Sequence, residues 1–514
     1  MFGLFKKKEP ARRRYPTPRR VVSNRPGYVR SMTRQAKRPR GGRRTYDVLK
    51  TNRLTSDFLA PIESADMTVR GKLRKARGLS RNLCANDPFA KKFLRLMATN
   101  VVGPHGVGFQ SRAKDPGGEL DRSANELIES AFKDWGKRGT ASTNGLLSWL
   151  TLQTLAITSV PRDGEIFFRV IENFPNKYGF ALQPLEADMV DDELNGAARN
   201  GNEIRLGVEI DEWQRPVAYY VLTNHPGDYQ YSTGQRHERI PAEEMIHIYL
   251  VERVGQTRGI PWFLTSAQRM RMLSGYEEAE LVAARTGASK MGFFYDGENG
   301  DTYQGDDEDS DGNLITEVTP GQLERLPNGI KFEAFDPQHP TTAFKEFHKG
   351  VLRGIAAGLG PSYNGLASDA ESVSFSSIRH FTLEDRDFYM GLQSWIVEGL
   401  HDQMYPRWLR MAFLTGEIAL PFSKFNKFNA PHWQPRRWEW VDPAKDTKAK
   451  REDLGLTASP QQLCLERGRD FYEMVDEMAE AQDYARQKGV TLATANPEKQ
   501  EENSAEAESS DKDD

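Results

Sequence analysis

Apolar residues recur at helical spacing through the first third of the chain. In "RNLCANDPFAKKFLRLMATNVVG" they fall near one face, which predicts a helical segment over residues 68–100. The Gly- and Pro-rich "VVGPHGVGF" ends that segment. The same period predicts helices over 121–137 and 144–159. The residues on the first apolar face are Leu83, Phe89, Phe93, Leu96 and Met97.

The period changes between Glu165 and Leu250. The runs "GEIFFRVIEN", "FALQPLEA", "EIRLGVEIDE" and "RPVAYYVLT" are short, rich in β-branched and aromatic residues, and divided by Gly, Asn and Asp. We therefore expect a small antiparallel sheet or barrel set among the helices.

Helical patterning returns in the second half of the chain. Pro261 opens a stretch expected to run as one helix of about 25 residues, roughly 37 Å long, with polar flanks that suit a wall better than a core. A strand is predicted in "LPNGIKFEAF", followed by a Pro-bounded loop. Further helices are predicted over 341–360, 374–400 and 460–489. The resulting fold class is α+β.

Composition adds a segregation of charge to this picture. The chain has 514 residues, a mean hydropathy of −0.67 and a formal charge of only −3. Yet residues 1–53 hold eighteen Lys or Arg against two acids, a local balance of +16. We read 1–55 as a largely unpacked basic arm, either an assembly arm or a contact for nucleic acid or an acidic partner. Its candidate contact residues are Arg12, Arg13, Arg14, Arg19, Arg20, Arg43 and Arg44.

Acidic residues gather at two other places. Eight acids and no base lie between Asp296 and Asp311, and an acidic tail ends the chain. The first cluster looks like a calcium loop, but its twelfth position is Val318 rather than a glutamate. We therefore expect a solvated acidic loop and no metal site.

Signals for catalysis are missing. The nine histidines form no metal-ligand spacing, and the two cysteines, Cys84 and Cys464, suggest structural thiols in a reducing setting. "GLGPSYNG" lacks the second glycine of a nucleophile elbow. The triplet Asp191, Asp192 and Glu193 suits a solvated turn. No enzyme activity, cofactor or metal is expected, and no apolar run is long enough to predict a membrane span.

Four segments follow one another along the chain: "RNLCANDPFAKKFLRLMATNVVGPHGVGFQS", "LQPLEADMVD", "RIPAEEMIHIYLVERVGQTRGIPWF" and "FDPQHPTTAFKEFHKGVLRGIAAGLGPSYNGLASDAESVSFSSIRH". Their sequence and order resemble the portal proteins of tailed bacteriophages, the lambda-type family. The resemblance extends from about Arg44 to about Glu477. One departure is Phe375, where the family pattern leads us to expect tyrosine.

The resemblance implies a ring-forming portal fold with named regions. After the arm, a wing of helices and a β-rich part would span 56–260, a stem helix 261–288 and an acidic clip 289–325. A return to the wing with a tunnel loop would span 326–403, a helical crown 404–490 and a disordered acidic tail 491–514.

The resemblance also implies a function and partners. A ring of subunits, usually twelve, would stand at one capsid vertex. Double-stranded DNA would be packaged through it by terminase and later ejected. Head-tail connector proteins, major capsid protein and scaffold protein would be further partners, and no membrane would be involved. The protein would reside in the virion, and in the host cytoplasm during assembly.

Two groups of residues become candidate sites on this basis. The tunnel loop, at about Asp336–Lys345, would touch DNA with polar groups. The clip acids would either repel DNA phosphates at the channel mouth or dock basic partners, and the sequence does not choose between these roles. The tunnel-loop candidates are Gln338, His339, Thr341, Thr342, Lys345 and Lys349, and the clip candidates are Asp306, Asp307, Glu308, Asp309 and Asp311.

Two alternatives stay open at the level of sequence. A nonenzymatic head-tail adaptor or minor capsid protein would fit the lack of catalytic motifs, although adaptors are usually much shorter. A DNA-processing enzyme of the packaging apparatus would need a phosphate-binding loop or a carboxylate cluster, and the chain contains neither pattern.

Overall fold

A computed structural model of the chain describes most of the residues between Ile62 and Gly489. The described residues are 62–228, 236–288, 292–296, 307–308, 314–315, 330–334, 341–371, 373–438, 454, 459–466 and 471–489. All of them except Ile62 belong to one compact unit, Glu63–Asp514.

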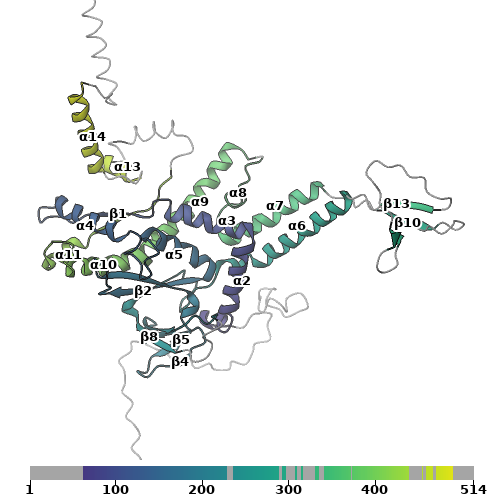
Figure 1. The fold of residues 1–514 in the computed structure, drawn as a ribbon, viewed down its shortest axis with the longest axis horizontal. Coiled ribbons are helices and arrows are strands. Elements are labelled where there is room, and N and C mark those ends of the chain that lie inside the picture. Colours follow the sequence, from purple (N-terminus) through teal and green to yellow (C-terminus); the bar gives the residue numbers. More distant parts are fainter. Residues whose placement is uncertain are drawn as a thin grey trace, which may run out of the picture. The chain divides into compact units, whose positions relative to one another are not determined.

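Helices form the first part of this unit (Figure 1). The predicted segment 68–100 is divided into separate helices. Gly71, at a φ of 69°, separates the first two, and Pro88 begins the third. Asp87 caps that third helix by accepting hydrogen bonds from the amides of Phe89 and Ala90, 2.8 and 2.9 Å away. The elements are α1 (Ala65–Val69), α2 (Leu73–Asn86), α3 (Pro88–Met97), the π-helical turn η3 (Ala98–Val102), α4 (Arg122–Trp135) and α5 (Trp149–Asp163).

The β-rich region folds into two antiparallel sheets, as the strand pattern predicts, and neither closes into a barrel. One has the strand order β3-β2-β9 and the other runs β4-β5-β6-β7-β8 in sequence order. The first six residues of β2 include five buried ones, since both faces of its sheet are covered. The strands are β2 (Glu165–Glu172), β3 (Phe180–Leu185), β4 (Gly196–Ala197), β5 (Glu203–Arg205), β6 (Val208–Ile210), β7 (Pro216–Leu222), β8 (His237–Pro241) and β9 (Met245–Tyr249).

Two long helices then lie side by side (Figure 1). The first starts later than predicted. Pro261 has an extended ψ of 130°, a 3₁₀ turn follows at Trp262–Thr265, and α6 runs over Ala267–Ala288. The second, α7 (Thr341–Leu359), agrees with its prediction. Between them β10 (Gly292–Asp296) pairs with β13 (Ile330–Ala334), and β11 (Asp307–Glu308) with β12 (Leu314–Ile315).

The last described elements close the core around aromatic side chains. The ring of Phe132 meets that of Trp408 edge-on at 4.9 Å, and the Trp135 indole donates to the carbonyl of Phe180 at 3.1 Å. The predicted helix 460–489 is described as two helices. The elements are α8 (Tyr363–Ala367), α9 (Phe375–Ile396), the π-helical turn η8 (Val397–His401), α10 (Asp402–Leu414), α11 (Phe425–Phe428), β1 (Gly108–Ser111) paired with β14 (Pro431–Gln434), α13 (Pro460–Glu466) and α14 (Phe471–Gln487).

Among the residues that the structure describes, no helix combines the length and the apolar character that a bilayer span requires.

Candidate functional site

The α6–α7 pair is joined by aromatic and polar contacts. The Tyr276 ring on α6 stacks against Phe344 on α7 with centroids 5.7 Å apart. One turn further along α7, His348 Nε2 lies 2.7 Å from the Glu277 carboxylate. The two helices therefore make specific side-chain contacts near the start of α7, where two predicted site residues are located.

Those two residues, Lys345 and Lys349, lie one helical turn apart on α7 and form ion pairs. The Lys345 ammonium is 2.7 Å from each carboxylate oxygen of Glu371. The Lys349 ammonium is 3.4 Å from Asp369 and 3.6 Å from Glu371. Both carboxylates come from the segment between α8 and α9, so each lysine is already paired with an acid of its own subunit.

The two carboxylates differ in how firmly they are held. Asp369 accepts a hydrogen bond from the Tyr363 hydroxyl at 2.7 Å and another from the amide of Glu371 at 2.9 Å. The Tyr363 hydrogen bond is the main cause that lowers the pKa of Asp369 to about 2. The hydrogen bond from Lys345 lowers the pKa of Glu371 as well. The Glu371 side chain is 57% exposed and that of Asp369 only 21%, so water reaches the Lys345–Glu371 pair far more freely.

A second cluster of charges is fully buried and centres on Glu165 of β2. One oxygen of its carboxylate accepts from Arg77 at 2.7 Å and from Arg258 at 2.8 Å. The other lies 2.8 Å from His247 Nε2 and from the amide nitrogen of Gly259. Burial raises the pKa of Glu165, but the opposing effects of Arg258, His247 and Arg77 are larger together and hold it well below its usual range. Glu165 therefore stays ionised in the core.

Arg258 holds the chain that leads into α6. Besides Glu165, its guanidinium donates to the backbone carbonyls of Ala187, Val190 and Leu206, at 2.8, 3.1 and 2.6 Å. A planar guanidinium can satisfy several acceptors at once, which a lysine cannot. The cluster thus fixes the segment before α6 against both sheets.

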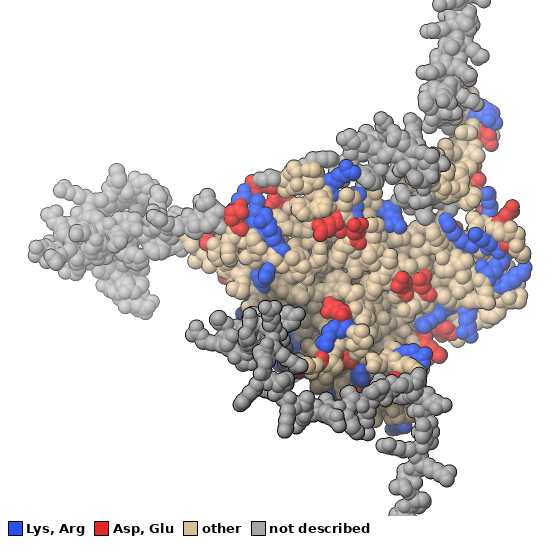
Figure 2. All heavy atoms as spheres, turned by 180° about the vertical axis from the view of Figure 1, so that it is seen from behind, with Lys and Arg blue, Asp and Glu red and all other residues tan. Residues whose placement is uncertain are grey.

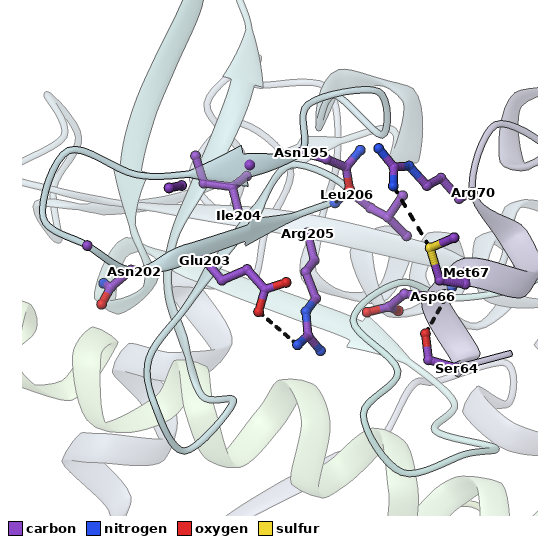
Figure 3. Close-up of a pocket in the computed structure, with 13 residues that line it drawn as sticks. Ser64, Asp66, Met67, Arg70, Asn195, Asn202, Glu203, Ile204, Arg205 and Leu206 are labelled. Carbon is purple, nitrogen blue, oxygen red and sulfur yellow. Dashed lines mark hydrogen bonds and ion pairs between the residues drawn. The ribbon is translucent and has the colours of Figure 1, made fainter. Parts of the chain in front are cut away.

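The structure also contains a cleft of about 600 Å³ between α1 and the β4–β5 hairpin (Figure 3). Arg205 pairs there with Glu203 at 2.8 Å. Asp66, 7% exposed, accepts from the amide of Thr257, and its second oxygen is buried without a hydrogen-bond partner. The lining carries charges of both signs and no catalytic pair.

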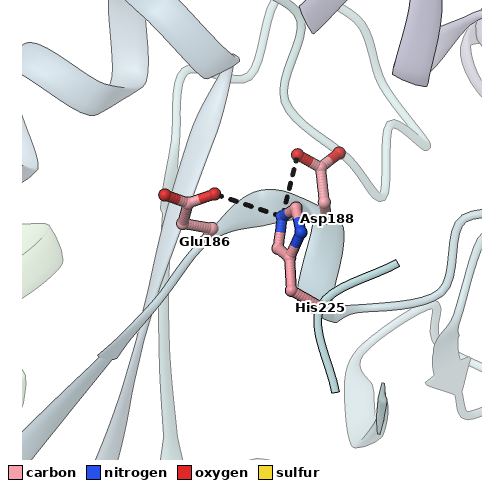
Figure 4. A group of neighbouring side chains, drawn as sticks. All are labelled: Glu186, Asp188 and His225. Atoms are coloured by element: carbon pink, nitrogen blue, oxygen red, sulfur yellow. Dashed lines mark ion pairs between the residues drawn. The ribbon is translucent and has the colours of Figure 1, made fainter. Parts of the chain in front are cut away.

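Within the described residues, one group of side chains has the spacing of a metal site: Glu186, Asp188 and His225 (Figure 4). The Arg77 guanidinium lies 3.0 Å from one oxygen of Asp188, and that of Arg81 lies 2.6 Å from the other. Arg81 also reaches Glu186 at 3.6 Å. Two guanidinium cations thus occupy the positions from which the carboxylates would coordinate a metal, so these residues do not fit one.

On the face seen in Figure 2, basic and acidic side chains are interspersed over the coloured surface. Duplex DNA binding usually requires a stripe of Lys and Arg along one face. The coloured residues of this face form no such stripe.

Most predicted site residues fall outside the described part of the chain. This applies to all arm residues, to Asp306, Asp309 and Asp311 of the acidic loop, and to Gln338 and His339. The backbone of Asp307 and Glu308 lies in β11. Thr341 and Thr342 lie in the first turn of α7 rather than in a loop, because that helix begins at Thr341. Of the segment expected as a tunnel loop, residues 341–345 thus belong to α7, and 336–340 fall outside the described part of the chain.

The triplet Asp191, Asp192 and Glu193 was expected to be a solvated turn, and for two of its members this is wrong. Only Glu193 is well exposed. Arg74 forms an ion pair with each of the three, at 2.9 to 3.0 Å, and His237 lies 2.8 Å from Asp191. These acids join α2 to the second sheet.

The acids at the centre of the two charge clusters, Glu165 and Glu371, were not predicted from the sequence. Glu165 directly precedes the apolar "IFF" at the start of a predicted strand, and an acid beside such a run is a signal of a buried ion pair. No comparable signal identifies Glu371 as the partner of the α7 lysines, because the contact depends on how the α8–α9 segment folds back.

The family model and the related sequences point to one family. Residues 51–393 match the family model described as phage portal protein, lambda family. The chain is 36% identical over 444 residues to the "Probable portal protein" of Halomonas phage phiHAP-1, covering 85% of this chain and 86% of that protein. It is 22% identical to "Portal protein B" of Escherichia phage lambda, covering 80% and 84%. A solved structure, the neck of an empty GTA particle, is similar with a TM-score of 0.47 and 14% identity, covering 79% of this chain and 97% of that chain.

Proposed function

Because this chain belongs to the lambda family of phage portal proteins, we propose that its subunits assemble into a ring, of about twelve copies by analogy with the family, around a channel for double-stranded DNA. Terminase drives DNA inward through this channel, and the DNA later leaves by the same route. The family match over residues 51–393 carries the proposal. That range includes both sheets, the α6–α7 pair and the predicted tunnel loop.

We assign the regions of the portal accordingly. The wing takes residues 56–260 and returns at 326–403, the stem takes 261–288 with α6 as its helix, and the crown takes 404–490. The length of α6 and its contacts with α7 support a stem helix that packs against the returning wing. The buried Glu165 cluster supports a rigid junction between wing and stem, since it ties the chain before α6 to the sheets.

The acidic residues at 306–311 belong to the proposed clip. They either keep phosphates from sticking at the channel mouth or receive basic surfaces of terminase and head-tail connector proteins. The basic arm, 1–55, contacts DNA or acidic scaffold, and the capsid proteins surround the ring. The protein belongs to the capsid of the virion, and assembly takes place in the host cytoplasm.

We further propose that the portal carries no catalytic activity of its own. The family is a structural one, and the carboxylates of the described clusters are paired with arginines, lysines, histidines or backbone groups. ATP hydrolysis would then belong to terminase. The family match also disfavours the head-tail adaptor and DNA-processing alternatives.

Electron microscopy of the purified full-length chain tests ring formation directly. We expect rings with a central hole, and a monomer or an open filament would overturn the proposal. Deleting residues 336–340, which spares α7, then tests the tunnel loop. Rings and procapsids should form, but fewer heads should retain full-length DNA. Normal packaging by this deletion would contradict the loop assignment.

Removing residues 1–40 tests the arm. We expect rings to form and their incorporation into heads to fall, with any DNA binding of the arm strongly dependent on salt. Failure of the shortened chain to form rings would make the arm part of the ring itself.

A further inference from the structure

The lysines of α7 present an apparent contradiction. In the proposed portal they lie in the first turns after the tunnel loop, the place where positive charge would attract DNA most strongly. Yet Lys345 and Lys349 carry two positive charges against the two negative charges of Asp369 and Glu371, so the group is neutral as it stands.

The four charges are arranged as one fixed and one exchangeable pair. Lys349 is 16% exposed, and its partner Asp369 has two further hydrogen bonds that hold it in place. Lys345 and Glu371 are each more than half exposed and meet at the surface of the group. An exposed ion pair of this kind is worth only about 0–1 kcal/mol, so a competing anion can separate it.

We propose that Glu371 is an internal competitor that masks Lys345 from DNA phosphates, so that passing DNA touches this lysine only briefly. This inference rests on the proposed DNA channel. A phosphate that reaches Lys345 must displace Glu371, and Glu371 recaptures the ammonium when the phosphate moves on. The expected partner is therefore the sugar-phosphate backbone, without regard to base sequence.

The mask explains why the channel can contain lysines near its loop without holding DNA in place. A bare ammonium would release counterions on contact with each phosphate, and affinity would rise with each contact. A paired ammonium loses its carboxylate contact when it gains the phosphate, so the net gain is small. Salt dependence is the property that distinguishes the two cases.

Glu371→Gln is the decisive variant, because glutamine keeps the size of the side chain and removes its charge. DNA binding by the full-length protein is measured with a short fluorescent duplex over a series of salt concentrations. The variant should bind more tightly than the wild type, and its affinity should fall more steeply with salt. The slope of log K against log salt should steepen by about 0.9 for the one phosphate that the freed Lys345 neutralises.

Two matched variants separate masking from a general loss of negative charge. Glu346 is exposed and adjacent to Lys345 on α7, so Glu346→Gln removes one charge from the same neighbourhood. It should raise affinity much less than Glu371→Gln. Adding Lys345→Gln to Glu371→Gln should remove most of the gain, because the released ammonium is then absent.

Three results would overturn the mask. These are an unchanged affinity and salt slope in Glu371→Gln, an effect equal to that of Glu346→Gln, and a gain that persists in full without Lys345. Circular dichroism of each variant identifies a misfolded one, in which case Glu371→Ala replaces glutamine. Micrographs of the same preparations test ring formation separately. Rings with unchanged affinity would reject the mask while leaving the proposed function intact.

Discussion

Gly259 and Gly164 cross so closely that neither position has room for a side chain. A Cβ atom on Gly259 would lie 2.1 Å from the carbonyl oxygen of Gly164 and 2.8 Å from the Cβ of Glu165. Neither neighbour is the flexible end of a side chain. The crossing places the amide of Gly259 against the Glu165 carboxylate, so backbone contact and ion cluster depend on each other.

Gly259→Ala should therefore destabilise the subunit by roughly 3 kcal/mol or more, because the backbone must move to admit one methyl group. Urea unfolding followed by circular dichroism measures this. Gly275→Ala is the matched control. Nothing lies within 4 Å of a Cβ at this position of α6, so alanine should raise stability by about 0.5–1 kcal/mol. Equal effects of the two changes would contradict the proposed crossing.

Replacing Glu165 with glutamine should cost about 3–5 kcal/mol, because Arg77 and Arg258 would remain buried without their shared carboxylate. The control is Glu203→Gln, which breaks the exposed pair with Arg205 and should cost about 0–1 kcal/mol. Urea unfolding of both variants supplies the comparison. A Glu165→Gln protein as stable as its control would show that the arginines find other partners.

Acid should weaken the fold through a buried histidine. His401 is fully buried, and this burial lowers its pKa to about 4, with a partial offset from the Ile396 carbonyl. In the unfolded chain the pKa of this histidine is about 6.5. The unfolded chain therefore binds a proton at pH values at which His401 of the folded chain is still neutral. The stability from neutral His401 is thus fully present above about pH 6.5 and is lost as pH falls toward about 4.

Lowering the pH from about 7 to about 5 should cost about 2 kcal/mol through this residue. His401→Phe should remove that part of the pH dependence, even if it also changes the stability at neutral pH. The control is His105→Gln at an exposed position, which should leave the pH dependence unchanged. Carboxylates with lowered pKa values lose their contribution only below about pH 4.5, outside this interval. An unchanged slope in His401→Phe would disprove the assignment, and buried His247, whose pKa burial also lowers, would be tested next.

The packing of α7 against the start of α6 depends on Gly358. A Cβ there would lie 2.4 Å from the Ser266 hydroxyl, which itself donates to the carbonyl of Ile355 at 3.2 Å. Gly358→Ala should cost about 1–3 kcal/mol in urea unfolding. Adding Ser266→Ala removes the obstructing oxygen and should restore part of the loss.

Gly350→Ala provides the control on the same helix. Nothing lies within 4 Å of its Cβ position, so alanine there should be neutral or stabilising. If Ser266→Ala lowers the stability of the Gly358→Ala protein further, the loss of the Ser266 hydrogen bond outweighs the relief of the clash. The close approach to Ser266 would then not be the reason why position 358 requires glycine.

The sequence predicted the elements better than their junctions. The helix α4 and the strand β13 lie close to their expected positions because their apolar spacing and turn residues are clear. The segment 68–100 divides at Gly71 and Pro88, since a positive φ and a missing N–H interrupt a helix locally even where the apolar face continues. The period of apolar residues does not contain that information.

For the candidate site, the sequence predicted which residues are neighbours on one helix. It did not predict which residues from other elements contact them. Lys345 and Lys349 were expected to lie one turn apart on a single helix, and they do. Their pairing with Glu371, 26 residues beyond Lys345, follows from the turn after α8, where Ser368 has a φ of 54°. Charge partners of this kind are determined by tertiary structure, and a single sequence does not reveal them.

The contacts of Arg258 also set an order for folding. The four acceptors of its guanidinium, Leu206, Val190, Ala187 and Glu165, precede it by 52, 68, 71 and 93 positions, so each of these side-chain bonds closes a long loop. Such contacts are slow to form, because chain entropy is lost before any bond compensates for it. The residues that lead into α6 can therefore become fixed only after both sheets exist. The amide of Gly259 should accordingly be among the last in this region to gain protection from hydrogen exchange during refolding.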